Sequence, residues 1–523
     1  MGIMGWKFGS LTVASCVGLA LLIGRAGIAR AQSSDSSESV TELKTEVSEL
    51  KQEVQELKGE MGTLKKQEAV AAPEGTPPAA PKTVGEHVGA IEKDVSDIKK
   101  NLSDNLGVHV HGLTDVTYGY NINHPQSSGG SKGGPNPTAP GGSINQLREF
   151  DTNANGWTLE QFNIHIDKSS DGGVGFLTDL NFGQVADVMG ASTRYSNLNP
   201  TANATTNTIV DPTQAYLTYT APFGKGINLQ LGRMVTLLGA EVIPVYNNTN
   251  FNESRGFLFT LGEPLTHTGL RGNYAFNDKV SATLGVNNGW DDISDNNDGQ
   301  TVEGELSMNT GDLMPHNQSL SLVLNGIYGP EQVNHGSSTR WAIDPILTYK
   351  TPIKGLQLIS EYLYAEEGPP VSVVPAYSSH GNRFCDPSTF CTPAPGFTPG
   401  PQGSVNIPNT VSWTGTAGYI VYDWNDNLEF ATRGEYFRDA DGARSGMRQT
   451  LGEITETINY KIPAVNGLLA RLEYRHDESG AKPFFSNETI ASTPLTISEG
   501  VAGLPVHTYA GQDTFLVSAI YAF

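Results

Sequence analysis

Charged side chains recur at every second position in several short segments of this sequence. In residues 468–475, Arg471, Glu473 and Arg475 alternate with apolar residues, so an extended chain places all three charges on one face. Three charges on one face require water or oppositely charged partners, and we therefore expect them to face an aqueous interior. The same phase predicts an inward position for Asp115, His165, Asp167, Asp179, Arg271, Glu303, Glu305, Glu361, Arg433, Glu435, Arg471, Glu473 and Arg475.

The chemistry open to these residues is electrostatic. Both signs of charge occur, so strong ion selectivity is not implied, and salt bridges that stiffen a wall are an equally good interpretation. A further hypothesis is that Arg271, Arg433, Arg471 and Arg475 form one basic side of a transverse field. We find no G-x-S-x-G or comparable signal for a hydrolase, although such groups can be dispersed, and we predict that the chain is not an enzyme.

One acidic stretch is faintly similar to a calcium-binding loop. Residues 291–305 include Asp295, Asp298 and Glu305, but Ser294 stands where that loop needs an aspartate. We interpret the stretch as a polar turn, and we predict no metal and no cofactor.

Strands with two unlike faces must position the charged residues. In residues 108–120, Val108, Val110 and Tyr118 share one face while His109 and Asp115 share the other. The pattern returns in residues 174–182, 279–286 and 468–475, and about sixteen such segments occur, as in a membrane barrel. We predict an all-β fold over residues 107–523, a transmembrane antiparallel β-barrel of about 16 strands. A water-soluble sandwich or solenoid also alternates, but it lacks systematic short and long connections.

The connections between these segments alternate between short and long. Because antiparallel strands turn at alternate ends, all short connections lie at one end, and we expect that end to face the periplasm. The short turns are predicted at residues 169–172, 221–226, 277–278, 310–318, 351–355, 425–427 and 462–466. The long connections are predicted at residues 121–156, 183–210, 234–265, 367–409 and 478–509, with three shorter ones between.

Aromatic residues fall on the apolar faces near both strand ends, where a barrel meets its two lipid–water boundaries. The final strand ends in Phe523 and resembles the C-terminal signal of outer-membrane proteins. At the short-turn end stand Tyr219, Phe276, Tyr349, Tyr460, Tyr521 and Phe523, and at the other end Tyr118, Phe182, Tyr328, Tyr436 and Tyr474.

Bulk composition excludes several classes of protein. The chain has 523 residues, a formal net charge of −22, a hydrophobic content of 37% and a mean hydropathy of −0.29. Such an acidic chain is poorly suited to binding nucleic-acid phosphates, so no nucleic-acid partner is predicted. The composition also suits neither a helical membrane bundle nor a leucine-rich cytosolic enzyme.

The N-terminus carries export signals. The apolar run at residues 11–23 is about half of the roughly 20 residues that a spanning helix needs. With Lys7 before it and Ala29 and Ala31 in an A-x-A cleavage signal, residues 1–31 are predicted to be a signal peptide. A lipoprotein box ending at Cys16 is the disfavoured alternative. In an oxidising compartment, we expect a loop disulfide between Cys385 and Cys391 rather than free thiols or a metal site.

Two heptad segments precede the predicted barrel. Apolar residues spaced three and four apart predict a coiled-coil helix over residues 38–68 and a second helical heptad segment over residues 83–106. The Pro- and Ala-rich stretch 69–82 contains four prolines and is predicted to be a linker. A solvated helix without a partner is the alternative.

Four short stretches carry a resemblance to a known family. They are residues 232–233 with 239–241, residues 264–269, residues 288–291 and residues 472–477. Together with the terminal aromatic residue, they resemble the OmpL-like β-barrel porins over roughly residues 107–523. The resemblance implies diffusion of small solutes through a water-filled pore with no fixed substrate. Trimeric assembly, the more general habit of porins, is expected with it, although Val and Leu in the heptads favour two strands.

We therefore expect a bacterial outer-membrane porin that lets small hydrophilic solutes or ions diffuse passively, with lipid around it and the stalk in the periplasm. Residues 234–265 are the best candidate to fold inward and constrict the pore. Leu237, Val242 and Phe257 are among their apolar residues, which would be unusual in water. Packing of this loop on a neighbouring subunit is the alternative.

Two other functions stay open. A structural tether would join the membrane to the peptidoglycan cell wall through residues 38–106, and deletion of that stalk would discriminate it from a conducting pore. A specific transporter would need a dense ladder of one residue type or a plug domain, and neither is visible in the sequence.

Overall fold

The computed structural model describes most of the predicted barrel region. The predicted signal peptide (1–31), coiled-coil helix (38–68), linker (69–82) and most of the second heptad segment (83–106) lie outside the described residues, as do Cys385 and Cys391. The described residues are 102–104, 106–125, 145–170, 173–195, 210–243, 250–311, 314–315, 318–332, 335–368, 371–373, 398–399, 405–407, 410–445, 448–481, 484–489 and 506–523.

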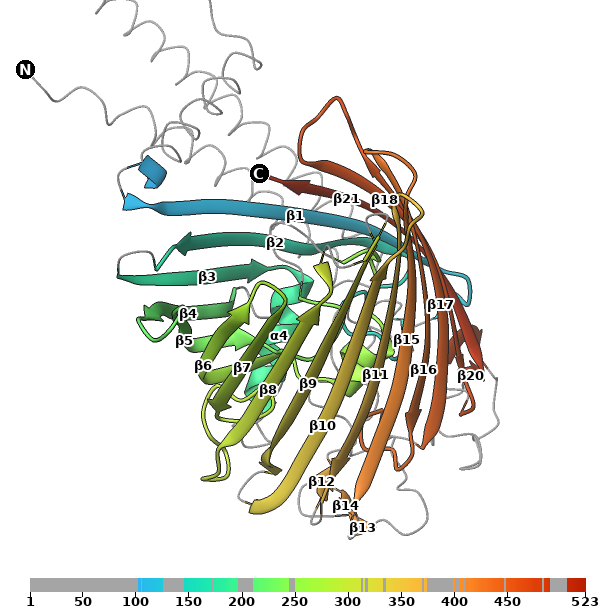
Figure 1. The fold of residues 1–523 in the computed structure, drawn as a ribbon. Coiled ribbons are helices and arrows are strands. Elements are labelled where there is room, and N and C mark those ends of the chain that lie inside the picture. Colours follow the sequence, from blue (N-terminus) through green and yellow to red (C-terminus); the bar gives the residue numbers. More distant parts are fainter. Residues whose placement is uncertain are drawn as a thin grey trace, which may run out of the picture. The chain divides into compact units, whose positions relative to one another are not determined.

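Antiparallel strands form a closed barrel in chain order, in which the first strand pairs with the last (Figure 1). The predicted barrel of about 16 strands is confirmed. Its strands are β1 (Val108–Asn121), β2 (Gly156–Lys168), β3 (Val174–Phe182), β4 (Asp211–Ala221), β5 (Ile227–Val235), β6 (Thr266–Asn277), β7 (Val280–Asn287), β8 (Thr301–Asn309), β9 (Ser319–Gln332), β10 (His335–Lys350), β11 (Leu356–Glu367), β15 (Val411–Asp423), β16 (Leu428–Asp439), β17 (Gln449–Lys461), β18 (Leu468–Ser479) and β21 (Gly511–Ala522).

The remaining elements lie within the long connections. Helix α4 (Gln184–Tyr195) follows β3, and a single π-helical turn, η2 (Leu258–Gly262), precedes β6. Strands β12 (Val371–Val373), β13 (Thr398–Pro399) and β14 (Val405–Ile407) form a small sheet, and β19 (Phe484–Thr489) pairs with β20 (Val506–Tyr509). No helix in the described part of the chain is long and apolar enough to cross a membrane.

The strand ends confirm the predicted alternation of connections. Each predicted short turn falls between the end of one strand and the start of the next, as at residues 222–226 between β4 and β5. The five predicted long connections also lie between consecutive barrel strands, at the opposite end. The three shorter connections at that end follow β7, β9 and β16. We call the two ends of the barrel the short-turn end and the long-loop end. The N-terminus of β1 and the C-terminus of β21 both lie at the short-turn end.

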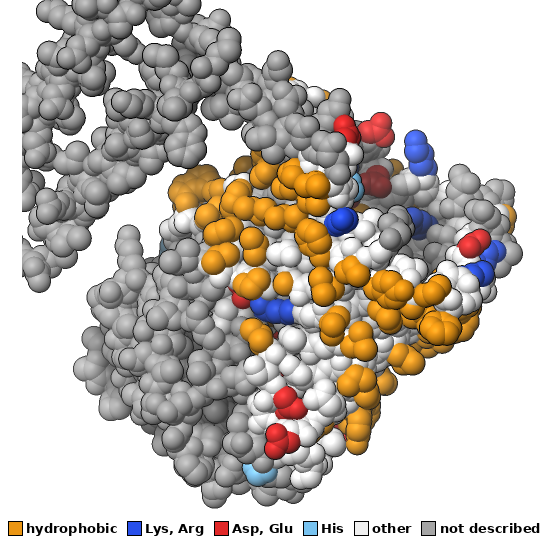
Figure 2. Space-filling model, turned by 90° about the vertical axis from the view of Figure 1, so that its left-hand side faces the viewer, with side chains coloured by type: hydrophobic (Ala, Val, Ile, Leu, Met, Phe, Trp, Pro, Cys, Tyr) orange, Lys and Arg blue, Asp and Glu red, His pale blue; other side chains and the backbone are white. Residues whose placement is uncertain are grey.

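Large apolar side chains cover the outward face of the strands. Leu284 is 73% exposed, Leu231 56% and Leu472 49%, each alternating with an inward residue. Figure 2 shows hydrophobic side chains gathered across one face of the described part of the chain. The predicted aromatic residues Tyr219 and Tyr328 are 44% and 55% exposed at opposite strand ends. So much exposed apolar surface is stable only against lipid or a partner.

A β-bulge adjusts the inward face of β2. Asp115 pairs with Gln161 and Val116 with Leu159, so Glu160 is an extra residue on β2. Glu160 and Gln161 are both buried, which strict alternation would not allow. The bulge therefore turns two adjacent polar side chains away from the outward face.

Candidate functional site

The connection between β5 and β6 folds into the barrel. The backbone N–H of Gly239 donates to Asp344 Oδ2 on β10 at 2.7 Å, and that of Glu253 donates to Glu473 Oε2 on β18 at 2.6 Å. A segment that leaves β5 reaches both β10 and β18 only through the interior. We call residues 236–243 and 250–265 the inward loop. Its predicted inward course is confirmed for these residues.

The inward loop is seated on an apolar patch of the barrel wall. Phe257, Leu258 and Leu261 of the loop are fully buried in one cluster that includes Trp413 and Ala417 of β15. The indole Nε1 of Trp413 also donates to the carbonyl oxygen of Gly262 at 2.9 Å. Each such buried side chain contributes about 1.5–3 kcal/mol.

The inward face of β15 is apolar from Val411 to Val421. Val411, Trp413, Ala417, Tyr419 and Val421 are all at most 5% exposed, whereas the intervening Ser, Thr and Ile side chains face outward. Such a face would be unusual beside a water-filled lumen. On this strand the inward loop replaces water, and the interior becomes a small hydrophobic core.

Arg433 on β16 is the central charged anchor of the loop. Its guanidinium donates to Glu453 Oε1 on the adjacent strand at 2.8 Å and to the carbonyl oxygen of Ser254 at 2.8 Å. It also forms an ion pair with Glu241 of the loop. Arg433 is fully buried, so its charge depends entirely on these partners.

Glu473 and Arg471 on β18 bind the middle of the loop. The carboxylate of Glu473 accepts hydrogen bonds from the backbone N–H groups of Glu253 and Ser254. Arg471 forms an ion pair with Glu253 at 2.9 Å and donates to the carbonyl oxygen of Asn250 at 2.9 Å. Both side chains point inward, as predicted. The inward loop buries each of them.

Four more of the predicted residues contact the loop. Arg475 donates to the carbonyl oxygen of Arg255 and lies 4.8 Å from the ring centroid of Phe257. Glu435 accepts from the backbone N–H of Phe257, Glu361 accepts from that of Ala240, and Asp115 lies beside Glu253. These side chains bind the inward loop. The sequence predicted that they point inward, but it did not indicate whether they would contact water or the loop.

The remaining predicted residues lie on β2, β3, β6 and β8. Arg271 on β6 donates to both carboxylate oxygens of Glu303 on β8, each at 3.0 Å. His165 contacts Asp179 at 2.8 Å across β2 and β3. Glu305 is half-buried, as is Asp167, which lies 3.3 Å from His109.

The hypothesis of one basic side is wrong. Arg271 stands on β6, nearly half the circumference away from β16 and β18 in the closed strand order. Arg271, Arg433, Arg471 and Arg475 are also each paired with a carboxylate. The four guanidinium groups therefore do not build a shared positive face.

The part of the interior that remains exposed is lined mainly by uncharged polar side chains. They lie in phase with Arg271: Thr218 pairs with Gln230, and Gln230 pairs with Arg271 across β4, β5 and β6. Sequence reasoning missed them because it followed charges only, although their inward phase was available. Together with the predicted Glu305, we call the following half-buried or exposed residues the exposed wall: Thr218, Asn228, Gln230, Asn273, Ser281 and Ser307.

Two further segments fold inward beside the loop. Arg148, between β1 and β2, forms a buried ion pair with Asp477 of β18 at 2.6 Å. Val185 and Met189 of α4 pack in one cluster with Phe259 of the inward loop. Both segments were predicted only as outer connections, because their partners are distant in sequence.

The β7–β8 connection holds a buried acidic residue near the long-loop end. Asp292 is 2% exposed and lies beside Glu331 and Asp291. Burial, followed by the charges of Glu331 and Asp291, raises the pKa of Asp292 to about 9. The folded chain therefore favours the protonated form of this carboxyl.

The stretches that resemble a known family meet at the inward loop. Glu241 binds Arg433, and Asp291 accepts hydrogen bonds from the backbone N–H groups of Leu265 and Thr266. Glu473 binds the middle of the loop, as described above. Glu241, Asp291 and Glu473, one from each of three of these stretches, thus help to hold this loop inside the barrel.

A match to a known protein family agrees with this architecture. A model of the family described as "putative beta-barrel porin-2, OmpL-like" matches residues 107–523. Among solved structures, an anion-selective porin from Comamonas acidovorans is similar, with 10% identity, a TM-score of 0.44, and coverage of 80% of this chain and 99% of that one. OprB from Pseudomonas putida is similar, with 9% identity, a TM-score of 0.43, and coverage of 82% and 97%. No curated protein matches the chain.

Proposed function

We propose that this chain, which belongs to the family of OmpL-like β-barrel porins over residues 107–523, lets small hydrophilic solutes or ions diffuse passively across the bacterial outer membrane. The family and the closed barrel supply the porin architecture. Passive diffusion without a fixed substrate is the step that we add.

The observation that carries the proposal is the division of the inner wall. On β15–β18, most inward side chains are buried beneath the inward loop, but on β4–β8, Gln230, Asn273 and Ser307 remain partly exposed inside the barrel. Polar side chains that keep solvent contact inside a lipid-facing barrel are what a water-filled path requires. We propose that solutes move along this exposed wall.

The inward loop is the proposed constriction. It occupies interior space between β5 and β18 and is fixed at both halves, through Glu241 to Arg433 and through Glu253 to Arg471. A barrel of this strand number would be wide without it. The loop would therefore set an upper size limit for solutes.

Weak ion selectivity follows from the lining of the exposed wall. Glu305 is the single charged member among the residues named for it, and Arg271 nearby is neutralised by Glu303. With few unpaired charges along the path, hydration and size would govern passage more than charge. We propose small polar solutes and ions of either sign as the permeants.

Orientation and assembly complete the proposal. We place the short-turn end in the periplasm, where the predicted coiled-coil stalk before β1 would also lie. We expect a homo-oligomer, with a trimer as the expected form. In it, the outward apolar face of each barrel would contact lipid and the neighbouring subunits.

Planar-bilayer recording of the purified full chain tests the function. Stepwise openings with a nearly ohmic current are expected in potassium chloride, with a small reversal potential in a salt gradient. Protein that inserts but stays silent at every voltage would refute conduction. Co-insertion of contaminating porins is controlled by a preparation from the same host without the expressed chain.

A further inference from the structure

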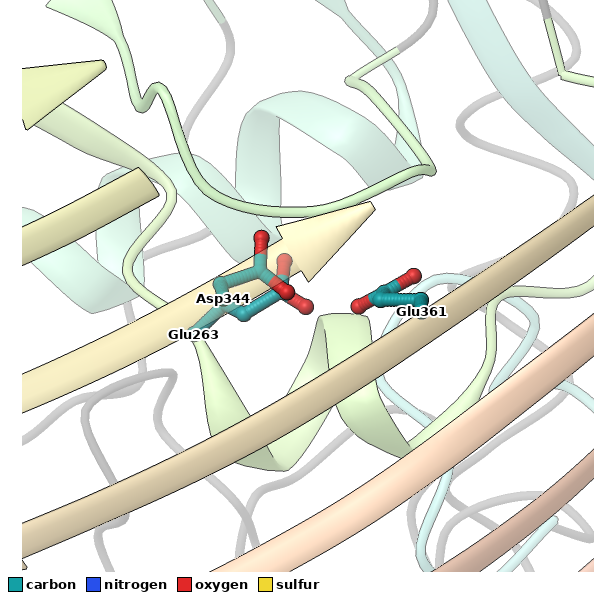
Figure 3. Close-up of side chains that lie close together, drawn as sticks. All are labelled: Glu263, Asp344 and Glu361. Atoms are coloured by element: carbon teal, nitrogen blue, oxygen red, sulfur yellow. The ribbon is translucent and has the colours of Figure 1, made fainter. Parts of the chain in front are cut away.

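Three carboxyl groups from distant parts of the sequence meet inside the barrel. Glu263 lies near the end of the inward loop, Asp344 lies on β10 and Glu361 on β11, and one oxygen from each lies within 4.8 Å of the others. Figure 3 shows the three carboxyl groups pointing toward one another. Glu263 and Asp344 are fully buried and Glu361 is 2% exposed, so water does not screen their mutual repulsion well.

The protein satisfies only part of this cluster. Asp344 Oδ2 accepts from the backbone N–H of Gly239 at 2.7 Å, and Glu361 Oε2 accepts from that of Ala240 at 3.1 Å. Apart from the side chain of Glu361, which lies in hydrogen-bonding contact with that of Glu263, neither carboxylate oxygen of Glu263 nor Oδ1 of Asp344 has a hydrogen-bond partner among the described residues. Unpaired buried oxygens of this kind are costly, and each therefore points to a missing partner.

Positive charge from the protein does not balance the cluster. Arg433, whose charge acts on Glu361, is already paired with Glu241 and Glu453. Within the described residues, no lysine, arginine or histidine forms an ion pair with Glu263, Asp344 or Glu361. Up to three negative charges thus share one buried site.

We propose that Glu263, Asp344 and Glu361 bind a divalent cation, Ca²⁺, that ties the end of the inward loop to β10 and β11. The donors are all oxygens, which suits a hard cation and disfavours metals that select sulfur or imidazole ligands. Ca²⁺ fits better than Mg²⁺ because it takes six to eight oxygens at about 2.3–2.6 Å in irregular geometry. Its remaining ligands would be water.

The position of Glu263 explains what the ion would do. Its side chain lies against the backbone of Gly239, since a Cβ built there would come within 2.1 Å of Glu263 Oε2. The ion would therefore join both halves of the inward loop to the wall. It would fix the loop at β10 and β11, as Arg433 and Arg471 fix it at β16 and β18.

Calcium titration of the full chain tests the site. The protein is refolded from urea into detergent without lipopolysaccharide, and Ca²⁺ binding is followed by isothermal titration calorimetry. One saturable site is expected, and Glu263→Gln should weaken it by about tenfold or more, equivalent to about 1.4 kcal/mol. The exposed Asp298→Asn, in the β7–β8 connection, should bind like the parent. No saturable binding by the parent, or equal binding by Glu263→Gln, overturns the proposal.

A second measurement needs no variant. Hydrogen exchange of residues 258–265 should slow in Ca²⁺ relative to chelator, while exchange of the β4–β5 turn should not change. Equal exchange in both conditions would also overturn the site. Because the site does not depend on conduction, its failure would leave the proposed porin function standing, and a silent barrel could still bind Ca²⁺.

Discussion

Toward the short-turn end of β4–β8 the inward side chains are mostly uncharged, polar and partly exposed, whereas on β15–β18 most inward side chains are apolar, hydrogen-bonded or ion-paired and buried beneath the inward loop. Both walls follow the same alternation with an apolar outward face. The difference is the partner: water on one wall and protein on the other. Period-two patterning thus defines which side chains face inward, while the connections determine whether that interior is a lumen or a core.

The two walls also differ in what a substitution should cost. On the packed wall, Arg433 and Glu453 are desolvated, so removing one partner strands a buried charge. On the exposed wall, a new polar group meets water. The comparison therefore predicts large stability effects on one wall, and effects on permeation with little loss of stability on the other.

Removing the inward loop should give the largest change. Replacing residues 238–263 with a short Gly-Ser linker opens the interior between the two walls, and single-channel conductance should rise about twofold or more. The reason is that conductance increases with the open cross-section. Heat-modifiable mobility in electrophoresis checks that the barrel has folded. A folded variant with unchanged conductance would show that the loop does not narrow the path.

Arg433→Met should destabilise the packed wall strongly. It leaves Glu241 and Glu453 without their shared buried cation, and the free energy of unfolding should fall by about 3–5 kcal/mol. Urea unfolding of the detergent-bound chain measures the change. The control is Arg438→Met, an exposed arginine on the same strand, which should alter stability by less than about 0.5 kcal/mol. Similar losses in both variants would contradict the assigned role of Arg433.

Asn273→Lys should change permeation while leaving the fold intact. A positive charge on the exposed wall of β6 should raise anion relative to cation permeability by about twofold, seen as a shifted reversal potential in a salt gradient. Stability should change by less than about 0.5 kcal/mol. The matched Asn459→Lys buries its charge under the loop and should cost stability instead. Unaltered selectivity in Asn273→Lys would remove β6 from the path.

The smallest effect concerns Asp292 at the long-loop end. Its folded pKa of about 9 exceeds the unfolded value, so the folded chain binds the additional proton and stability falls as pH rises from about 4 to 9. Asp292→Asn should remove this dependence and raise Tm at pH 8.5 by about 2–4 °C, with little change at pH 4. Thermal scans at both pH values measure it, with Asp298→Asn as control. An equal shift at both pH values would contradict the raised pKa.

The strands and connections were predictable because alternation and turn lengths are local properties. The inward face of β15 was not. Trp413 and Ala417 alternate with polar residues, so the usual rule assigns them to lipid, and only their contact with Phe257 and Leu258 places them inside. That contact joins residues that lie far apart in sequence.

The charged part of the site shows the same limit. Strand phase predicted that Arg433, Arg471 and Glu473 point inward, but it carried no information about their partners in the loop. Glu263 was missed altogether, because its carboxyl meets Asp344 and Glu361 only after the barrel closes. Phase is encoded locally, whereas pairing depends on the closed fold.

Thiol modification of matched threonines tests the division between the walls most directly. Thr218 on β4 is partly exposed, and Thr457 on β17 is 2% exposed and accepts a hydrogen bond from the side-chain amide of Asn252 in the inward loop. Each is changed to Cys in a chain with Cys385 and Cys391 replaced by Ser, and a charged, membrane-impermeant reagent is added during bilayer recording. We predict rapid modification and reduced current for Thr218→Cys, and no reaction for Thr457→Cys. Equal rates at both positions, or faster reaction at Thr457→Cys, would contradict the account.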